Sequence, residues 1–215
     1  MARGAFIVLE GLDRSGKSTQ VAKLVDRLNQ TGHKARLQKF PDRTTAIGKM
    51  IDAYLQSQAE LDDRAIHLFE AIKRDLANGM TIVADRYAFS GIAFSAAKGL
   101  PFTFCLNPDA GLPLPDLTLY LTVPPEVAST RGAYGVERYE NLDMQTRTRE
   151  QFAAVAREVQ ARHGEDRWVQ VSAVGTIDEV EARIWELVDG ALRRVDEQES
   201  DSPQTHLITE IIRNS

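Results

Sequence analysis

Short apolar runs alternate along the chain with longer stretches in which apolar residues recur at helical spacing. The runs, most of them rich in valine, isoleucine and leucine, predict strands at residues 6–9, 35–40, 81–84, 117–123 and 168–172. After the first run, Val21, Leu24, Val25 and Leu28 fall on one helical face. Further helices are predicted after residue 44, after residue 124, and at residues 60–78, 88–98, 143–163 and 177–192.

This alternation predicts an α/β fold. Strands that are joined through helices run parallel with right-handed crossovers, and the helices cover both faces of the sheet. A chain of 215 residues is long enough for one substantial core. We therefore predict one domain at residues 1–192, followed by a polar tail at residues 193–215.

The loop after the first strand carries a phosphate-binding motif. Residues 11–18 read G-L-D-R-S-G-K-S and fit the P-loop pattern G-x-x-x-x-G-K-[ST] between a strand and a helix. Gly11 and Gly16 let successive N–H groups point into one anion-sized hollow, and the following helix adds its positive end. Lys17 can reach the β- and γ-phosphates of a nucleotide, and the Ser18 hydroxyl can bind Mg²⁺. The alternative is a glycine-rich turn that binds no ligand.

Charged residues in nearby loops extend the candidate site. Arg14, inside the P-loop, is either an arginine finger supplied by the same chain or a solvated loop charge. Asp85 ends a buried strand, a place where an acidic residue beside a P-loop holds Mg²⁺, although it would also serve as a helix N-cap. Arg86 is predicted to point into the same crevice. Arg43 follows a strand and is either an anion-binding residue or a surface arginine.

Residues 131–141 are rich in charge, glycine and tyrosine, and they lack apolar periodicity. Such a segment between two helices is typical of a mobile lid that closes over phosphates. An ordinary exposed loop would have the same composition.

Composition argues against several other classes. The net charge is −5 without a basic cluster, which disfavours nucleic acid as a partner. One cysteine excludes an internal disulfide framework, and the four histidines lack the spacing of a zinc site. No apolar run is long enough to span a membrane, and the few residues before the first strand leave no room for a targeting peptide. We therefore expect a cytoplasmic or nuclear protein.

Five stretches together resemble the thymidylate kinase family over the chain to about residue 192. They are F-I-V-L-E-G-L-D-R-S-G-K-S-T-Q (6–20), F-P-D-R (40–43), D-R-Y-A-F-S-G-I-A-F (85–94), G-L-P-L-P-D-L (111–117) and R-G-A-Y-G-V-E-R-Y-E (131–140). The aspartate–arginine pair in the P-loop is similar to the eukaryotic type of the family. The resemblance implies a P-loop NTPase fold with a five-stranded parallel sheet, a homodimer, and transfer of the ATP γ-phosphate to dTMP.

The resemblance also implies a role for each site residue. Asp13, Arg14, Lys17 and Arg86 would be catalytic, and Ser18 and Asp85 would hold Mg²⁺. The residues implied in ATP binding are Gly11, Arg14, Ser15, Gly16, Lys17, Ser18, Thr19, Arg131, Gly175 and Thr176. The residues implied in dTMP binding are Asp13, Phe40, Arg43, Phe69, Arg86, Ser90, Phe94, Tyr139 and Gln145.

One stretch departs from the family pattern. After His67-Leu68-Phe69, about nine residues, or two to three helical turns, are missing relative to the family. The missing stretch includes the arginine that reads the thymine ring. Two readings therefore stand: an active dTMP kinase, in which thymine recognition would suffer more than phosphate chemistry, or a nucleotide-binding isoform with impaired or no catalysis.

Overall fold

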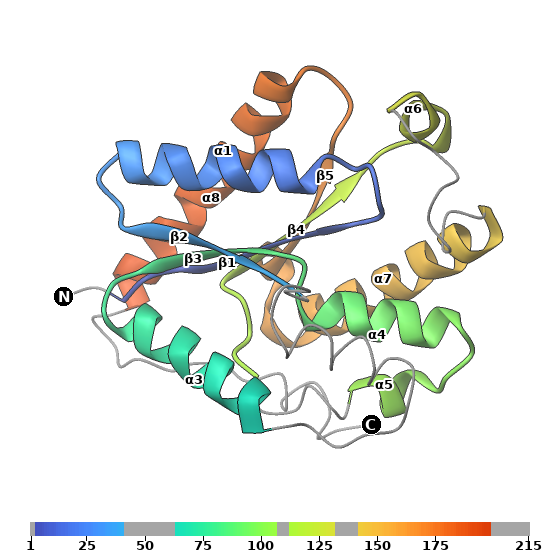
Figure 1. Cartoon of the computed structure of the whole chain (residues 1–215), viewed down its shortest axis with the longest axis horizontal. Helices are drawn as coiled ribbons and strands as arrows, with labels where there is room; N and C mark the ends of the chain where they lie inside the picture. Colours follow the sequence, from blue (N-terminus) through green and yellow to red (C-terminus); the bar gives the residue numbers. More distant parts are fainter. Residues whose placement is uncertain (1–2, 41–62, 107–111, 132–141, 199–215) are drawn as a thin grey trace.

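The computed structural model describes residues 3–40, 63–106, 112–131 and 142–198 of the chain (Figure 1). In this part, five strands form one parallel sheet in the order β2-β3-β1-β4-β5. The strands are β1 (Phe6–Gly11), β2 (Ala35–Lys39), β3 (Thr81–Asp85), β4 (Leu117–Thr122) and β5 (Trp168–Ser172). The predicted α/β fold with a five-stranded parallel sheet is confirmed.

The alternation of side chains along β1 divides the core into two layers. Phe6 and Val8 pack in a layer with α3 (Asp63–Ala77), α4 (Ala88–Ala97) and α7 (Leu142–His163). Ile7 and Leu9 pack in the other, with α1 (Lys17–Gln30) and α8 (Ile177–Gln198). Figure 1 shows these two sets of helices on opposite faces of the sheet. No helix of the described ranges has the length and apolar character needed to cross a membrane.

A buried carboxylate fastens the amino-terminal edge of the sheet. Asp116, just before β4, accepts a hydrogen bond from the Phe6 N–H at 2.9 Å. It also pairs with the guanidinium of Arg3 at 2.7 Å and with that of Arg167 at 3.1 Å. Phe6 is the first residue of β1, so this cluster lies at the opposite end of the strand from the P-loop.

Some element boundaries differ from the sequence prediction. The last helix was predicted to end at residue 192, but α8 continues to Gln198 because Val195 is buried against the same layer as Ile184 and Val188. A short helix, α5 (Phe102–Leu106), was not predicted; with Cys105 and Leu106 buried, it contributes to the layer under α4. The remaining elements are α6 (Pro125–Thr130) and the 3₁₀ turn η2 (Glu165–Arg167). The predicted helix after residue 44, most of the lid and the tail from residue 199 lie outside the described residues.

Candidate active site

Glycine is required at two positions of the P-loop. Gly11 has φ +146° at the end of β1, and a Cβ there would lie 2.6 Å from the Leu121 carbonyl oxygen. Gly16 has φ +89° and is the N-cap of α1. Residues with a side chain rarely adopt such positive φ angles, so these glycines let the chain turn from the strand into the helix.

Lys17 is buried at the centre of the loop. Its ammonium donates hydrogen bonds to the carbonyls of Gly11 and Leu12, at 2.8 and 2.7 Å. Burial lowers the pKa of Lys17 from 10.5 to about 8, and the nearby positive charge of Arg86 adds to this effect. Carboxylates close to the ammonium, among them Asp13 and Asp85, act in the opposite direction. The P-loop therefore holds a positive charge that burial destabilises and that an anion would stabilise.

Ser18 and Asp85 form a pair of oxygen donors beside Lys17. The Ser18 hydroxyl donates to the Asp85 carboxylate at 2.6 Å. Hydroxyl and carboxylate oxygens are the hard ligands that Mg²⁺ prefers. No group of three or more His, Cys, Asp or Glu side chains in the described ranges could hold a metal ion. The pair thus fits Mg²⁺ that takes its other ligands from phosphates and water. The N-cap of α4 is Tyr87 rather than Asp85.

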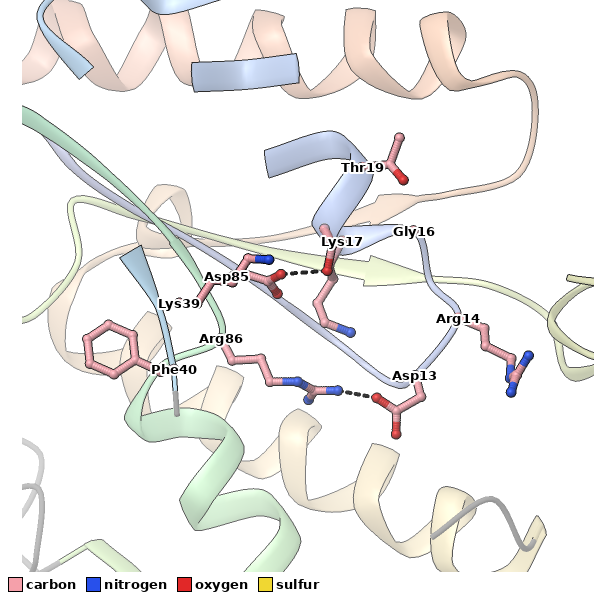
Figure 2. A pocket seen from close by; sticks show the side chains of 10 residues that line it. Asp13, Arg14, Gly16, Lys17, Thr19, Lys39, Phe40, Asp85 and Arg86 are labelled. Carbon is pink, nitrogen blue, oxygen red and sulfur yellow. Dashed lines mark hydrogen bonds and ion pairs between the residues drawn. The ribbon is translucent and has the colours of Figure 1, made fainter. Parts of the chain in front are cut away.

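Asp13 and Arg86 form an ion pair across the crevice (Figure 2). The Arg86 guanidinium also donates to the Ser90 hydroxyl at 3.2 Å and to the Gly11 carbonyl at 3.3 Å. It lies 5.7 Å from the centre of the Phe94 ring. Arg86 has φ +69°, a left-handed conformation that is uncommon for a residue with a side chain. Strained conformations of this kind cluster at functional sites.

Arg14 and Arg131 bridge the P-loop to the segment after α6. The Arg14 guanidinium donates to the Arg131 carbonyl at 3.0 Å, and the Arg131 guanidinium donates to the Arg14 carbonyl at 3.2 Å. Arg131 also donates to the Ala173 carbonyl at 2.6 Å, just past the end of β5. Arg131 therefore links three segments that follow strands: the P-loop after β1, its own segment after β4 and α6, and the loop after β5.

The loop after β5 is fixed by α8. The Thr176 N–H donates to the Glu179 carboxylate at 2.7 Å, and the Glu179 N–H donates to the Thr176 hydroxyl at 3.2 Å, which is a capping box. These hydrogen bonds with Thr176 lower the pKa of Glu179. From α1, the Gln20 side-chain amide donates to the Ile177 carbonyl at 2.9 Å. Gly175 and Thr176 thus have a defined position next to the P-loop helix.

A cavity of about 360 Å³ opens at the carboxyl ends of β1, β2 and β3. Its lining includes most of the P-loop and the residues that end β2 and β3: Asp13, Arg14, Gly16, Lys17, Ser18, Thr19, Lys39, Phe40, Asp85 and Arg86. Phe40 is held there by an edge contact with the Tyr87 ring, with the centroids 5.5 Å apart. The crevice of an open α/β sheet is the usual place for a ligand.

The structure brings together many of the predicted site residues. Apart from Gly11 and Ser15, which form the turn itself, the predicted site residues between Asp13 and Thr19 line the cavity with Phe40, Asp85 and Arg86. Ser90 and Phe94 contact Arg86 from α4. Gln145 is buried on α7 and does not line the cavity. Arg43, Tyr139 and the side chain of Phe69 lie outside the described residues.

Two polar residues at this edge were missed by the sequence analysis. Lys39 lines the cavity at the end of β2, and Glu10 is fully buried near the end of β1. The signals were present in the sequence. Lys39 is the last residue but one of the strand predicted at residues 35–40, on the edge where ligands bind, and Glu10 is a carboxylate that directly follows the apolar run at residues 6–9.

The P-loop and Arg86 thus bring positive charge from two neighbouring strand ends to one cavity, which is compatible with two phosphorylated ligands side by side, as a nucleoside monophosphate kinase requires. Comparisons with known proteins are more specific. The model of the thymidylate kinase family matches residues 9–184. The chain is 48% identical over 195 residues to thymidylate kinase of Schizosaccharomyces pombe, covering 86% of this chain and 92% of the relative. It is 43% identical over 206 residues to the human thymidylate kinase, covering 91% and 95%.

A solved structure agrees with these relatives. Thymidylate kinase from Candida albicans, described as having broad substrate specificity, aligns with a TM-score of 0.70 and 38% identity, over 88% of this chain and 93% of that chain. The chain belongs to the thymidylate kinase family.

Proposed function

We propose that this protein transfers the γ-phosphoryl group of ATP to dTMP, giving dTDP and ADP. The observation that carries this proposal is the pairing of Asp13, in the P-loop, with Arg86, at the end of β3, in a cavity that also contains Lys17. In this proposal, the P-loop side of the cavity takes the triphosphate and the Arg86 side takes a second anion. The membership of the family supplies the identity of that second substrate.

The donor site is proposed to be the P-loop. The turn formed by Gly11, Ser15 and Gly16 holds the ATP phosphates, with Lys17, Ser18 and Thr19 at the start of the helix. The Lys17 ammonium leaves the loop carbonyls and binds the phosphates, whose negative charge stabilises the protonated form. Ser18 and Asp85 hold Mg²⁺, which neutralises charge on the phosphates when it is bound. Arg131, with Gly175 and Thr176, is proposed to bind the adenine end of ATP.

The acceptor site is proposed to form around Arg86. A phosphate that binds the Arg86 guanidinium replaces the Asp13 carboxylate as its partner. The released Asp13 can then accept a hydrogen bond from the 3′-hydroxyl of the deoxyribose. Arg43 is proposed to hold the dTMP phosphate together with Arg86. Phe40, Ser90 and Phe94 are proposed to line the nucleoside pocket with Phe69, and Tyr139 and Gln145 to lie beside the sugar.

Arg14 is proposed to neutralise the phosphoryl group as it moves between the two sites. The acceptor is itself a phosphate with a second pKa of about 6, so it is ionised at neutral pH and needs no strong general base. Positioning and charge neutralisation then provide most of the rate enhancement. We further propose that the enzyme acts as a homodimer in the cytoplasm or nucleus. The alternative reading, an isoform without catalysis, has no support in the site, whose P-loop, Asp85 and Arg86 are assembled.

Label transfer from γ-labelled ATP tests the proposal. With Mg²⁺ and dTMP, the label should appear in dTDP, whereas label found only in inorganic phosphate would overturn the assignment. Arg14→Ala should lower turnover by about 10³–10⁵ if the arginine acts as a finger in cis. Arg193→Ala is the matched control, because Arg193 is an exposed arginine on α8 that pairs with Asp189. It should leave turnover unchanged.

A further inference from the structure

Glu10 is a fully buried carboxylate in the central strand of the sheet. The period-two alternation of β1 places it on the same face as Phe6 and Val8, beneath α4. Acidic side chains are almost never fully buried unless they are paired or hydrogen-bonded. The role of Glu10 therefore depends on what its oxygens contact.

Both oxygens of Glu10 accept hydrogen bonds from the start of α4. One accepts from the Tyr87 N–H at 2.9 Å and from the Ser90 N–H at 3.1 Å. The other accepts from the Ser90 hydroxyl at 2.6 Å. The N-cap residue Tyr87 makes no side-chain capping hydrogen bond, so a carboxylate from a different strand caps this helix. A negative charge is favoured there by the helix dipole.

Ser90 connects this carboxylate to the acceptor-site arginine. A serine hydroxyl has one proton, and that of Ser90 is directed at Glu10. The lone pairs of the hydroxyl therefore remain for the guanidinium of Arg86, which donates to it at 3.2 Å. Arg86 is also the residue directly before Tyr87, whose N–H donates to Glu10. Glu10 thus restrains both the side chain of Arg86 and the backbone that follows it.

The charges around Glu10 are consistent with this arrangement. Burial raises the pKa of Glu10, and the positive charge of Arg86, the hydrogen bonds from Ser90 and Tyr87, and Lys17 oppose the increase. All three hydrogen-bond donors point at the carboxylate oxygens, so this geometry is satisfied by the ionised form.

We propose that Glu10 is a positioning residue for the acceptor phosphate: it holds the first turn of α4 and, through the Ser90 hydroxyl, fixes the Arg86 guanidinium in the orientation that receives dTMP. The inference rests on the proposed function, because it assigns Arg86 to the dTMP phosphate. Glu10 itself touches neither substrate. Its effect should therefore appear in dTMP binding and not in ATP binding.

Steady-state kinetics of Glu10→Gln test this role. Glutamine keeps the size of the side chain but can present an N–H₂ donor toward Ser90, which reverses the polarity of the relay. The KM for dTMP should rise about tenfold, the size of one charge-assisted hydrogen bond, while the KM for ATP should stay within about twofold. Glu10→Met, which buries no charge, provides a second variant if Glu10→Gln does not fold.

Asp116→Asn is the matched control, because Asp116 is a buried carboxylate at the opposite end of β1. It should lower the melting temperature and leave the KM for dTMP unchanged. An unchanged KM for dTMP in the Glu10 variants, or an equal rise of both KM values, would overturn the positioning role. If the wild-type enzyme itself transfers no phosphate to dTMP, the proposed function fails first, and the inference fails with it.

Discussion

The buried ammonium of Lys17 should make ATP binding weaken as the pH rises above about 8. In the ligand-free protein, the Lys17 pKa is lowered to about 8. Bound phosphates would return the pKa toward or above its ordinary value of 10.5, because they place negative charge beside the ammonium. ATP therefore binds to the protonated form, and above pH 8 each binding event has to take up a proton.

The magnitude follows from the fraction of protein with a protonated Lys17. At pH 7 nearly all of the free protein is protonated at Lys17, and at pH 9 about one tenth is, for a pKa of about 8. We expect the affinity for ATP to fall about tenfold between pH 7 and pH 9, with uptake of roughly one proton per ATP at pH 9.

The same pKa shift predicts the stability of the ligand-free protein. The unfolded chain binds the Lys17 proton more tightly than the native protein does, so stability rises with pH between about 8 and 10.5. Relative to Lys17→Met, the wild-type free energy of unfolding should gain up to about 3 kcal/mol across this window. Below pH 8 both states hold the proton, and the difference between the two proteins should stay constant.

Isothermal titration calorimetry with ATP in buffers of different ionisation enthalpy measures the affinity and the proton uptake together. Lys17→Met should bind ATP more weakly and lose the pH dependence between 7 and 9. Lys23→Met removes an exposed lysine of the same helix, one that pairs with Asp178, and should keep the wild-type profile. A wild-type affinity that stays constant through pH 9, or a pH dependence that persists in Lys17→Met, would refute the reasoning.

Three further predictions concern packing and metal binding. Ile184→Ala, at a fully buried position of α8, should lower the free energy of unfolding by about 2–5 kcal/mol and the melting temperature by about 4–20 °C. Glu186→Ala, on the exposed side of α8, should change neither value. Equal melting temperatures of the two variants in calorimetry would contradict the packing. Gly4→Ala should destabilise the sheet by roughly 3 kcal/mol or more, because its Cβ would lie 2.0 Å from the Met80 carbonyl oxygen; unfolding in urea with a wild-type midpoint would exclude that clash. Asp85→Asn should raise the Mg²⁺ concentration needed for half-maximal turnover, and an unchanged Mg²⁺ titration would remove Asp85 from the metal site.

The sequence was sufficient for the fold and for the phosphate-binding loop, because both depend on local patterns. Apolar runs separated by helical periodicity specify a parallel sheet, and the P-loop combines a fixed spacing of residues with a strand and a helix around it. Asp85 and Arg86 could be placed for the same reason: the strand before them is apolar and ends at the edge where the P-loop lies.

The remaining parts of the site depend on contacts between distant segments. The bridge from Arg131 to the carbonyls of Arg14 and Ala173 joins residues far apart in the chain, so no local pattern reveals it. The capping of α4 by Glu10 likewise depends on the pairing of β1 with β3, which brings two strand ends together. The end of α8 was missed although its signal is local: Val195 lies three residues after Leu192 and seven after Val188, so it continues the buried helical face into the polar stretch.

The most direct test of the account is the rate of ADP release with ATP and Mg²⁺ when the acceptor is dTMP, dUMP, dCMP or AMP. The account predicts turnover with dTMP well above that with the other three acceptors. Similar rates with all four acceptors would show that phosphate transfer works but that the thymine ring is not recognised. An absence of turnover with dTMP, in a protein that still binds ATP, would contradict the central claim.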